Sequence, residues 1–199
     1  MRQVLVFTLG WVLIVGPLGA TQPVRGRPET ARQYRHHLLT KRWVAFAAAS
    51  SGINQARNVP HEWGRGWSGY AARFGSAFGE HLIKSTIEFG VATWHHEDPH
   101  YYRSDLHGTW PRLKYAVRTT FIVPRTNKPG KTVALSRFSG AFGAGMISRL
   151  WQPASTAGIG AGFASGGILL GADVGVHVAA EFWPRKSRGK RAIKRAARR

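Results

Sequence analysis

Apolar and polar positions repeat with helical spacing over much of the chain, and the clearest repeat covers residues 67–94. Positions four residues apart lie on one face of a helix. One face of this segment is charged, and large apolar side chains take the opposite face. The charged positions are Arg73, Glu80, Lys84 and Glu88. The pattern predicts one long amphipathic helix that ends before Asp98-Pro99, because the residue before proline avoids the helical region. This helix carries too much charge to span a bilayer.

Three more helices are expected on the same grounds. Residues 30–50 form a helix that Thr30 can cap, followed by a loop at 53–66. Residues 136–150 form a helix capped by Ser136, and residues 155–183 form a last helix that Pro184 ends.

Two segments leave alternatives open. Residues 110–122 read as a short helix or a strand, and residues 124–130 (PRTNKPG) read as a turn. Residues 173–178 alternate between valine and small or polar residues, which also suits a strand. The sequence as a whole predicts a mainly α fold: a single helical bundle of four or five helices with Gly-lined contacts, and a short β-hairpin near 120–135.

Glycine is abundant, at 24 residues, and much of it lies in two rows within the last predicted helix. Each glycine costs about 1 kcal/mol relative to alanine in a helix, so such a helix needs close neighbours. Rows of small residues let helix backbones approach and gain dispersion contacts. Gly75 and Gly79 in segment 67–94 have the same four-residue spacing. The predicted helix-packing positions are Gly75, Gly79, Gly158, Gly162, Gly166, Gly167, Gly171 and Gly175.

The last predicted helix combines a long uncharged stretch with one polar face near its end. No charge occurs between Leu150 and Ala172, which is long enough to cross a bilayer. Its many small residues favour a helix buried in a bundle, or one inserted after assembly with partners. Asp173, His177 and Glu181 lie four residues apart on one face and indicate polar packing.

The first residues have the layout of a targeting segment. Residues 1–20 contain an early Arg2, an apolar run and a small-residue end, which is typical of a secretory signal peptide. An uncleaved anchor is the alternative. We therefore expect the chain to consist of a signal peptide at 1–20, a linker at 21–29, a helical domain at 30–184 and a basic disordered tail at 185–199.

The formal net charge is +20, and nearly half of it lies in the tail. A basic block of this kind is attracted to anionic lipid surfaces or surface polymers. No aromatic residue lies between the tail charges, which disfavours specific nucleic-acid binding. The predicted anionic-surface residues are Arg185, Lys186, Arg188, Lys190, Arg191, Lys194, Arg195, Arg198 and Arg199.

The segment HHEDPHYYR, at 95–103, is the densest group of potential metal ligands. Its weak candidates are His95, His96, Asp98 and His100. Adjacent histidines on a helix point about 100° apart, so they rarely share one ion. No HExxH, GxSxG or P-loop motif occurs, and there is no cysteine. We therefore expect a structural helix end here, with Glu97 or Asp98 pairing Arg103, and we assign no catalytic residue, cofactor or metal.

Three sequence segments are similar to segments of known proteins: HEDPHYYR at 96–103, FSGAFGAGMISRLWQP at 138–153 and AAEFWP at 179–184. Together they resemble a family of exported bacterial proteins of unknown function, with the pattern HEDPxYYR, FSGAFGAG and EFWP. The resemblance covers roughly residues 55–184 and implies an exported unit, without implying an activity.

The function that the sequence favours is a non-enzymatic exported protein of the periplasm or cell envelope. It would be membrane-associated, with a packing role, apolar binding by residues 67–94 and anionic-surface binding by the tail. Self-association into a homo-oligomer is compatible with the glycine rows. Two alternatives stay open: an exported metal-dependent hydrolase that uses the His95–His100 group, and a cationic binder of nucleic acid or surface polymer.

Overall fold

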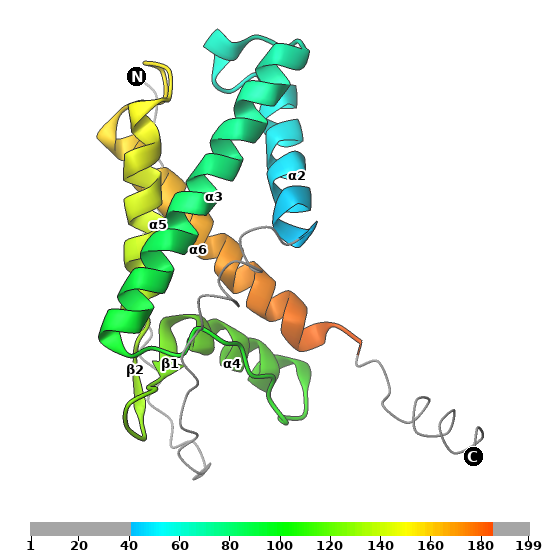
Figure 1. The fold of residues 1–199 in the computed structure, drawn as a ribbon. Coiled ribbons are helices and arrows are strands. Elements are labelled where there is room, and N and C mark those ends of the chain that lie inside the picture. The colour runs from blue at the N-terminus through cyan, green and yellow to red at the C-terminus, as the bar shows by residue number, and fades with distance from the viewer. Residues whose placement is uncertain (1–40, 185–199) are drawn as a thin grey trace, which may run out of the picture.

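The computed structural model describes residues 41–184, in which helices form a bundle with a β-hairpin at one end (Figure 1). This confirms the predicted mainly α class with a short hairpin. The predicted signal peptide at 1–20, the linker at 21–29 and the basic tail at 185–199 lie outside the described residues.

The first two described helices are joined at one end of the bundle. Helix α2, Lys41–Arg57, ends where Asn58 adopts a φ of 52°, a left-handed conformation that asparagine tolerates better than most residues. The prediction of a loop at 53–66 is therefore wrong for residues 53–57, because the helix continues to Arg57. A short 3-10 helix, η1 (His61–Trp63), leads into the long helix α3, Trp67–His95. Helix α3 matches the predicted amphipathic helix.

The end of α3 is tied to the hairpin. His96 closes the helix with a φ of 57°, and its backbone N–H donates to the carbonyl of Ala92. Strand β1, Ile122–Pro124, pairs antiparallel with β2, Lys131–Val133. The backbone N–H of Asp98 then donates to the carbonyl of Pro124 at 3.0 Å, which fastens the hairpin to the chain after α3. The preceding segment is helix α4, Thr109–Phe121, so the strand alternative for 110–122 is wrong.

The last two helices follow the hairpin directly. Helix α5, Leu135–Ile147, continues into the 3-10 helix η2, Ser148–Leu150. Ser136 lies inside α5 and is not its cap, because its side chain donates to Glu97 instead. Helix α6, Ile159–Phe182, starts four residues later than predicted and ends before Pro184 as expected. Since residues 173–178 are helical, the strand alternative there is also wrong.

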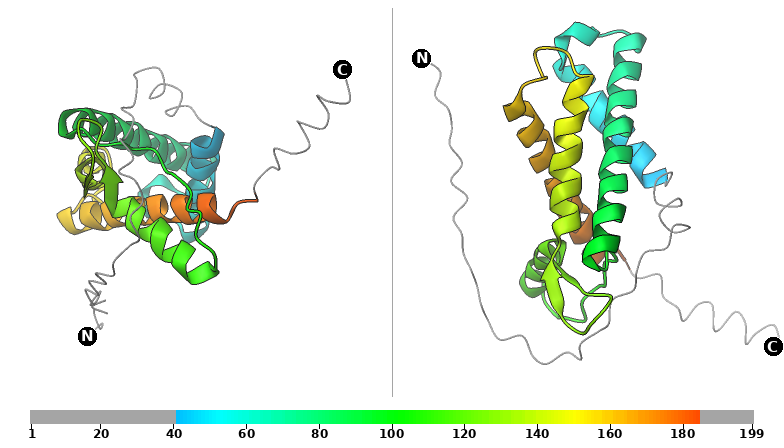
Figure 2. Two further views of the ribbon diagram at one scale, coloured as in Figure 1. Left: turned by 90° about the horizontal axis from the view of Figure 1, so that it is seen from below. Right: turned by 60° about the vertical axis from the view of Figure 1, so that its left-hand side comes forward.

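The helices are arranged as neighbouring layers. Helix α5 packs between α3 and α6, α2 packs on α3, and α4 packs against α6 (Figures 1 and 2). The right-hand view of Figure 2 shows α6, α5 and α3 side by side. We call the part that contains η1 and the start of α3 the η1 end. The part that contains the hairpin, α4 and the last turns of α3 and α6 is the hairpin end.

Candidate functional site

Charged and polar side chains fill the interior of the described bundle. Its buried apolar residues are six alanines and Val123, and buried polar or charged residues are twice as numerous. A soluble core normally excludes charges and collects large apolar side chains. Here the core is made of small residues and paired polar groups. The buried polar residues are Ser51, Arg73, Ser76, His81, Lys84, Glu97, Asp98, Thr120, Ser136, Arg137, Ser148, Asp173, His177 and Glu181.

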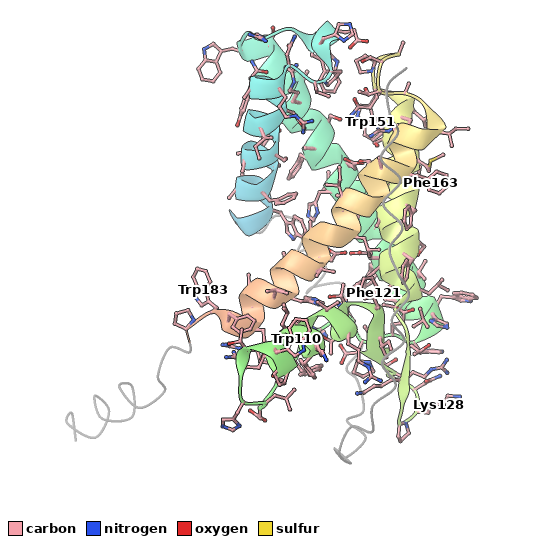
Figure 3. The ribbon with its side chains drawn as sticks, turned by 180° about the vertical axis from the view of Figure 1, so that it is seen from behind. Trp110, Phe121, Lys128, Trp151, Phe163 and Trp183 are labelled. Atoms are coloured by element: carbon pink, nitrogen blue, oxygen red, sulfur yellow. The ribbon has the colours of Figure 1, made fainter. Side chains whose placement is uncertain are left out.

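Large apolar side chains lie on the outside of the same helices. Trp67 is 87% exposed, Ile168 is 70% exposed and Phe163 is 56% exposed. Figure 3 shows Phe163 on α6, and Trp110 and Trp183 at the hairpin end. Further exposed apolar residues occur on α2, α5, η2 and α6, among them Val44, Phe46, Ile53, Leu135, Ile147, Leu150, Ile159 and Val176. The usual relation between polarity and burial is thus reversed.

A three-residue ion cluster joins α3 to α6 in the middle of the bundle. The Lys84 side chain is 3% exposed, and its Nζ donates to Glu88 Oε1 at 2.5 Å and to Asp173 Oδ1 at 3.0 Å. Removing charges from water costs several kcal/mol for each ion, and close opposite charges offset that cost. The charged row of α3 therefore faces inward, where Asp173 from α6 completes it.

A second polar cluster surrounds Glu181 at the hairpin end. Its carboxylate accepts hydrogen bonds from Tyr101 Oη at 2.7 Å, Ser104 Oγ at 2.6 Å and Arg112 Nε at 3.1 Å. Burial raises the pKa of Tyr101, and the hydrogen bond to Glu181 raises it further, so this phenol stays a donor. Arg103 donates to the backbone carbonyls of Glu181 and Trp183. The expected pairing of Arg103 with Glu97 or Asp98 is therefore wrong.

The polar packing predicted for Asp173, His177 and Glu181 on α6 is confirmed, with a different partner for each residue. Thr120 and His177 share a hydrogen bond between Oγ1 and Nδ1 at 2.9 Å, and the ring of Tyr101 stacks on the imidazole at 4.4 Å between centroids. Arg137 from α5 donates hydrogen bonds to the backbone carbonyls of Pro99, Thr119 and Thr120, and so binds α5 to this group.

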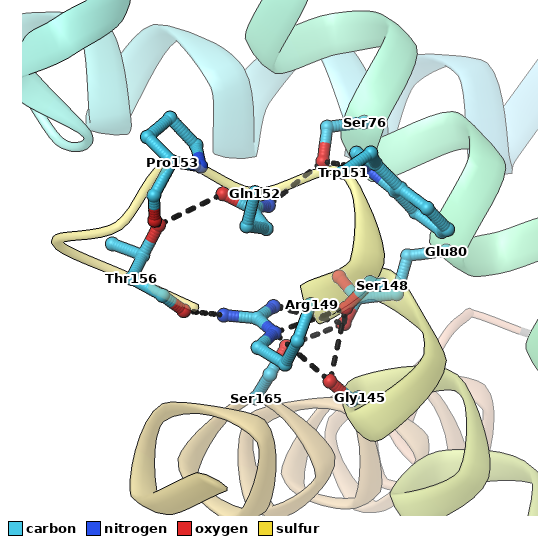
Figure 4. Close-up of polar contacts among 10 residues, drawn as sticks. All are labelled: Ser76, Glu80, Gly145, Ser148, Arg149, Trp151, Gln152, Pro153, Thr156 and Ser165. Carbon is cyan, nitrogen blue, oxygen red and sulfur yellow. Dashed lines mark hydrogen bonds and ion pairs between the residues drawn. The ribbon is translucent and has the colours of Figure 1, made fainter. Parts of the chain in front are cut away.

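A third cluster lies nearer the η1 end and is drawn in Figure 4. Glu80 accepts hydrogen bonds from Ser148 Oγ at 3.0 Å and Ser165 Oγ at 2.5 Å. Arg149 approaches the same carboxylate at 3.7 Å and also donates to the carbonyl of Gly145 at 3.0 Å. Glu80 thus connects α3 with both α5–η2 and α6.

Ser76 holds the chain that follows η2 onto α3. Its Oγ accepts hydrogen bonds from Trp151 Nε1 at 2.9 Å and Gln152 Nε2 at 2.8 Å, as Figure 4 shows. Trp151 is therefore oriented by a hydrogen bond as well as by packing, with its ring against Gly79.

The weak metal candidates are divided between separate partners. His95 Nδ1 lies 2.7 Å from Glu97, and His100 Nδ1 lies 2.7 Å from Asp98. Glu97 also accepts from Ser136, and Asp98 accepts from Tyr102. Within residues 41–184, no group of three His, Asp or Glu side chains is placed to hold a metal ion. This segment works as a link between the end of α3, the hairpin and α5.

Two of the predicted packing glycines lie at a tight contact between α5 and α6. A Cβ added at Gly166 would lie 2.5 Å from the ring of Phe142 and 2.9 Å from its Cα. A Cβ at Gly162 would lie 2.5 Å from Met146 Sδ. Gly145 on α5, which is not among the predicted packing positions, faces backbone atoms in the same contact. Its added Cβ would meet Gly162 O at 2.5 Å and Gly166 N at 2.7 Å.

The remaining predicted packing glycines do not line a close contact between described helices. An added Cβ would meet nothing within 4 Å at Gly75, Gly158, Gly167, Gly171 or Gly175, and only Trp151 at 3.8 Å from Gly79. For Gly167, Gly171 and Gly175 the physical reason is that α6 turns this row away from α5, and Gly158 lies at the cap before the first turn of α6. The prediction of helix packing is therefore wrong for these positions within the described residues.

Comparison with known proteins gives no further guide. The chain matches no protein-family model, no curated protein and no solved structure.

Proposed function

We propose that this chain is a non-enzymatic structural protein of the cell envelope, exported and embedded in a membrane by α3 and α6. The observation that carries the proposal is the reversed burial, with charges paired inside and large apolar side chains outside. Water does not favour such a surface, since contiguous exposed apolar patches mark sites that another apolar phase or partner covers. A lipid bilayer is the partner that covers all sides of a bundle at once.

The interior suits a lipid environment. Charged side chains within a bilayer face the bundle interior and pair with one another. The charge of α3, which alone argues against a bilayer-crossing helix, is accommodated in this way because Lys84 lies between Glu88 and Asp173. Close contacts between small residues are also the usual means of packing helices in lipid. Gly145, Gly162 and Gly166 form such a contact between α5 and α6.

The helix lengths support the same proposal. Helix α6 has 24 residues and spans about 36 Å, and α3 has 29 residues and spans about 43 Å, against about 30 Å of hydrocarbon. Among the described helices, α6 is apolar enough to cross a membrane, and only 22% of its most apolar window is buried in the bundle. A core helix of a soluble protein would be mostly buried.

Tryptophans lie toward both ends of the bundle. Trp67 begins α3 and Trp151 follows η2 toward the η1 end, while Trp94, Trp110 and Trp183 lie at the hairpin end. Tryptophan is enriched at both interfaces of membrane proteins, where its ring is apolar and its N–H is polar. The basic tail at 185–199 would add attraction to anionic lipid headgroups.

The experiment that tests the proposal is fractionation of cells that express the full chain. Membranes are washed with alkaline carbonate and then extracted with a mild detergent. An embedded protein stays in the pellet after carbonate and is released by detergent. A protein that carbonate releases would be peripheral at most, and one found in the soluble fraction would contradict the proposal.

A substitution on the outward face of α6 sharpens the test. Ile168→Asp places a carboxylate where we propose lipid, at a cost of about 3 kcal/mol at the centre of a membrane helix. We expect this variant to be lost from the carbonate-resistant pellet. Ala154→Asp, at an exposed position in the turn between η2 and α6, adds the same charge, is the matched control and should remain there. If Ile168→Asp behaves like its control, the outward face of α6 does not contact lipid.

A further inference from the structure

The exposed face of α4 carries a row of one aromatic and two basic residues. Trp110, Lys114 and Arg118 follow at four-residue intervals and are all exposed, while Ala116 and Thr120 face the interior. Lys114 Nζ lies 5.1 Å from the centroid of the Trp110 ring, so the cation and the aromatic ring form one unit. The helix contains three basic residues and no acidic one.

The hairpin, which follows α4 in the chain and lies at the same end of the bundle, carries further positive charge. Lys128 and Lys131 are exposed at the turn and at the start of β2, and Figure 3 shows Lys128 at the tip of the hairpin. No salt bridge within residues 41–184 involves any of the four exposed cations on α4 and the hairpin.

The polar interior explains why these cations have no carboxylate partner among residues 41–184. Residues 41–184 contain eight Asp or Glu, and only Glu62 and Asp105 are exposed. Glu62 is at the η1 end, where it accepts hydrogen bonds from Ser155. The other six carboxylates are turned inward, so the hairpin end presents cations with Asp105 as its single exposed described carboxylate.

We propose that the basic surface made by Trp110, Lys114, Arg118, Lys128 and Lys131 binds the anionic headgroups of bilayer phospholipids. The inference rests on the proposed function and adds a lipid class and a site within the folded bundle, separate from the tail. The exposed rings of Trp94 and Trp183 lie at the same end. Trp94 belongs to the last turn of α3 and Trp183 directly follows α6, so phosphates of the lipids around these helices would lie at the level of the cations.

The experiment uses the absence of cysteine from the chain. A single cysteine at Thr109, which is exposed at the start of α4, carries a small fluorophore on the full-length protein in vesicles. Quenching by brominated phosphatidylglycerol is compared with quenching by brominated phosphatidylcholine at equal mole fraction. We expect stronger quenching by the anionic lipid, with local enrichment of up to about fivefold for each cation near the surface.

Two double variants make the test specific. Lys114→Gln with Arg118→Gln should bring quenching by the two lipids close to equality. Arg57→Gln with Arg65→Gln removes the same charge from exposed positions at the η1 end and should preserve the preference. Equal quenching by both lipids in the unsubstituted protein, or the same loss in both double variants, would overturn the inference alone. Absence of quenching by either lipid would instead contradict the proposed function.

Discussion

The α5–α6 contact gives the most quantitative prediction, because one glycine there faces backbone atoms. A Cβ at Gly145 would lie 2.5 Å from Gly162 O and 2.7 Å from Gly166 N. A flexible side chain can rotate away from such an overlap, whereas a helix backbone has to move as a unit. Gly145→Ala should therefore force α5 and α6 apart.

The magnitude is a balance of two effects. Overpacking a close contact costs about 1–3 kcal/mol, and backbone neighbours favour the upper end of this range. Replacing a helical glycine by alanine returns about 1 kcal/mol of helix propensity. The net loss of unfolding free energy for Gly145→Ala is about 2 kcal/mol, which lowers the melting temperature by roughly 8 °C in a domain of this size.

Gly171→Ala is the matched control, because nothing lies within 4 Å of its added Cβ. It keeps the propensity gain without the overlap, so we expect stabilisation by about 1 kcal/mol. The assay is thermal unfolding of both purified variants in one mild detergent, followed by far-UV circular dichroism. If Gly145→Ala melts at or above the temperature of Gly171→Ala, then the tight α5–α6 contact does not exist.

Three further predictions concern the ion cluster, the Glu97 link and the tail. Lys84→Met leaves Glu88 and Asp173 buried without their cation and should cost about 3–5 kcal/mol in thermal unfolding, while Lys128→Met at the surface should change little. Ser136→Ala removes a donor to the buried Glu97 and should cost about 1–3 kcal/mol by the same assay; an unchanged melting temperature would contradict this link. Deleting residues 185–199 should weaken binding to anionic vesicles and flatten its salt dependence, and binding that stays equally salt-sensitive would contradict the tail's part.

Local sequence signals were sufficient to predict several element boundaries. Asp98-Pro99 marks the end of α3, Pro184 marks the end of α6, and the PRTNKPG turn lies between the two strands. These signals work because proline and glycine restrict or free the backbone at their own positions. Ser136 misled the prediction because its hydroxyl is used by Glu97, which is distant in sequence and adjacent only in the fold.

The direction in which a face points could not be predicted locally. The charged row of α3 and the row Asp173, His177 and Glu181 on α6 were visible as faces, but a helical wheel is the same whether its polar side turns in or out. The two glycine rows of α6 were likewise equivalent until Gly145 of α5 met one of them. In each case tertiary contact with another helix decides the outcome.

The central claim is that the outward face of α6 contacts lipid, and one measurement tests it most directly. Ile168→Cys supplies a single labelling site on that face, since the chain has no other cysteine. A fluorophore there, in the full-length protein reconstituted in vesicles, should be quenched strongly by lipids brominated in the middle of the acyl chain and weakly by aqueous iodide. Strong quenching by iodide would mean that this face is in water, and protection from both quenchers would mean that protein covers it; either result would contradict the account.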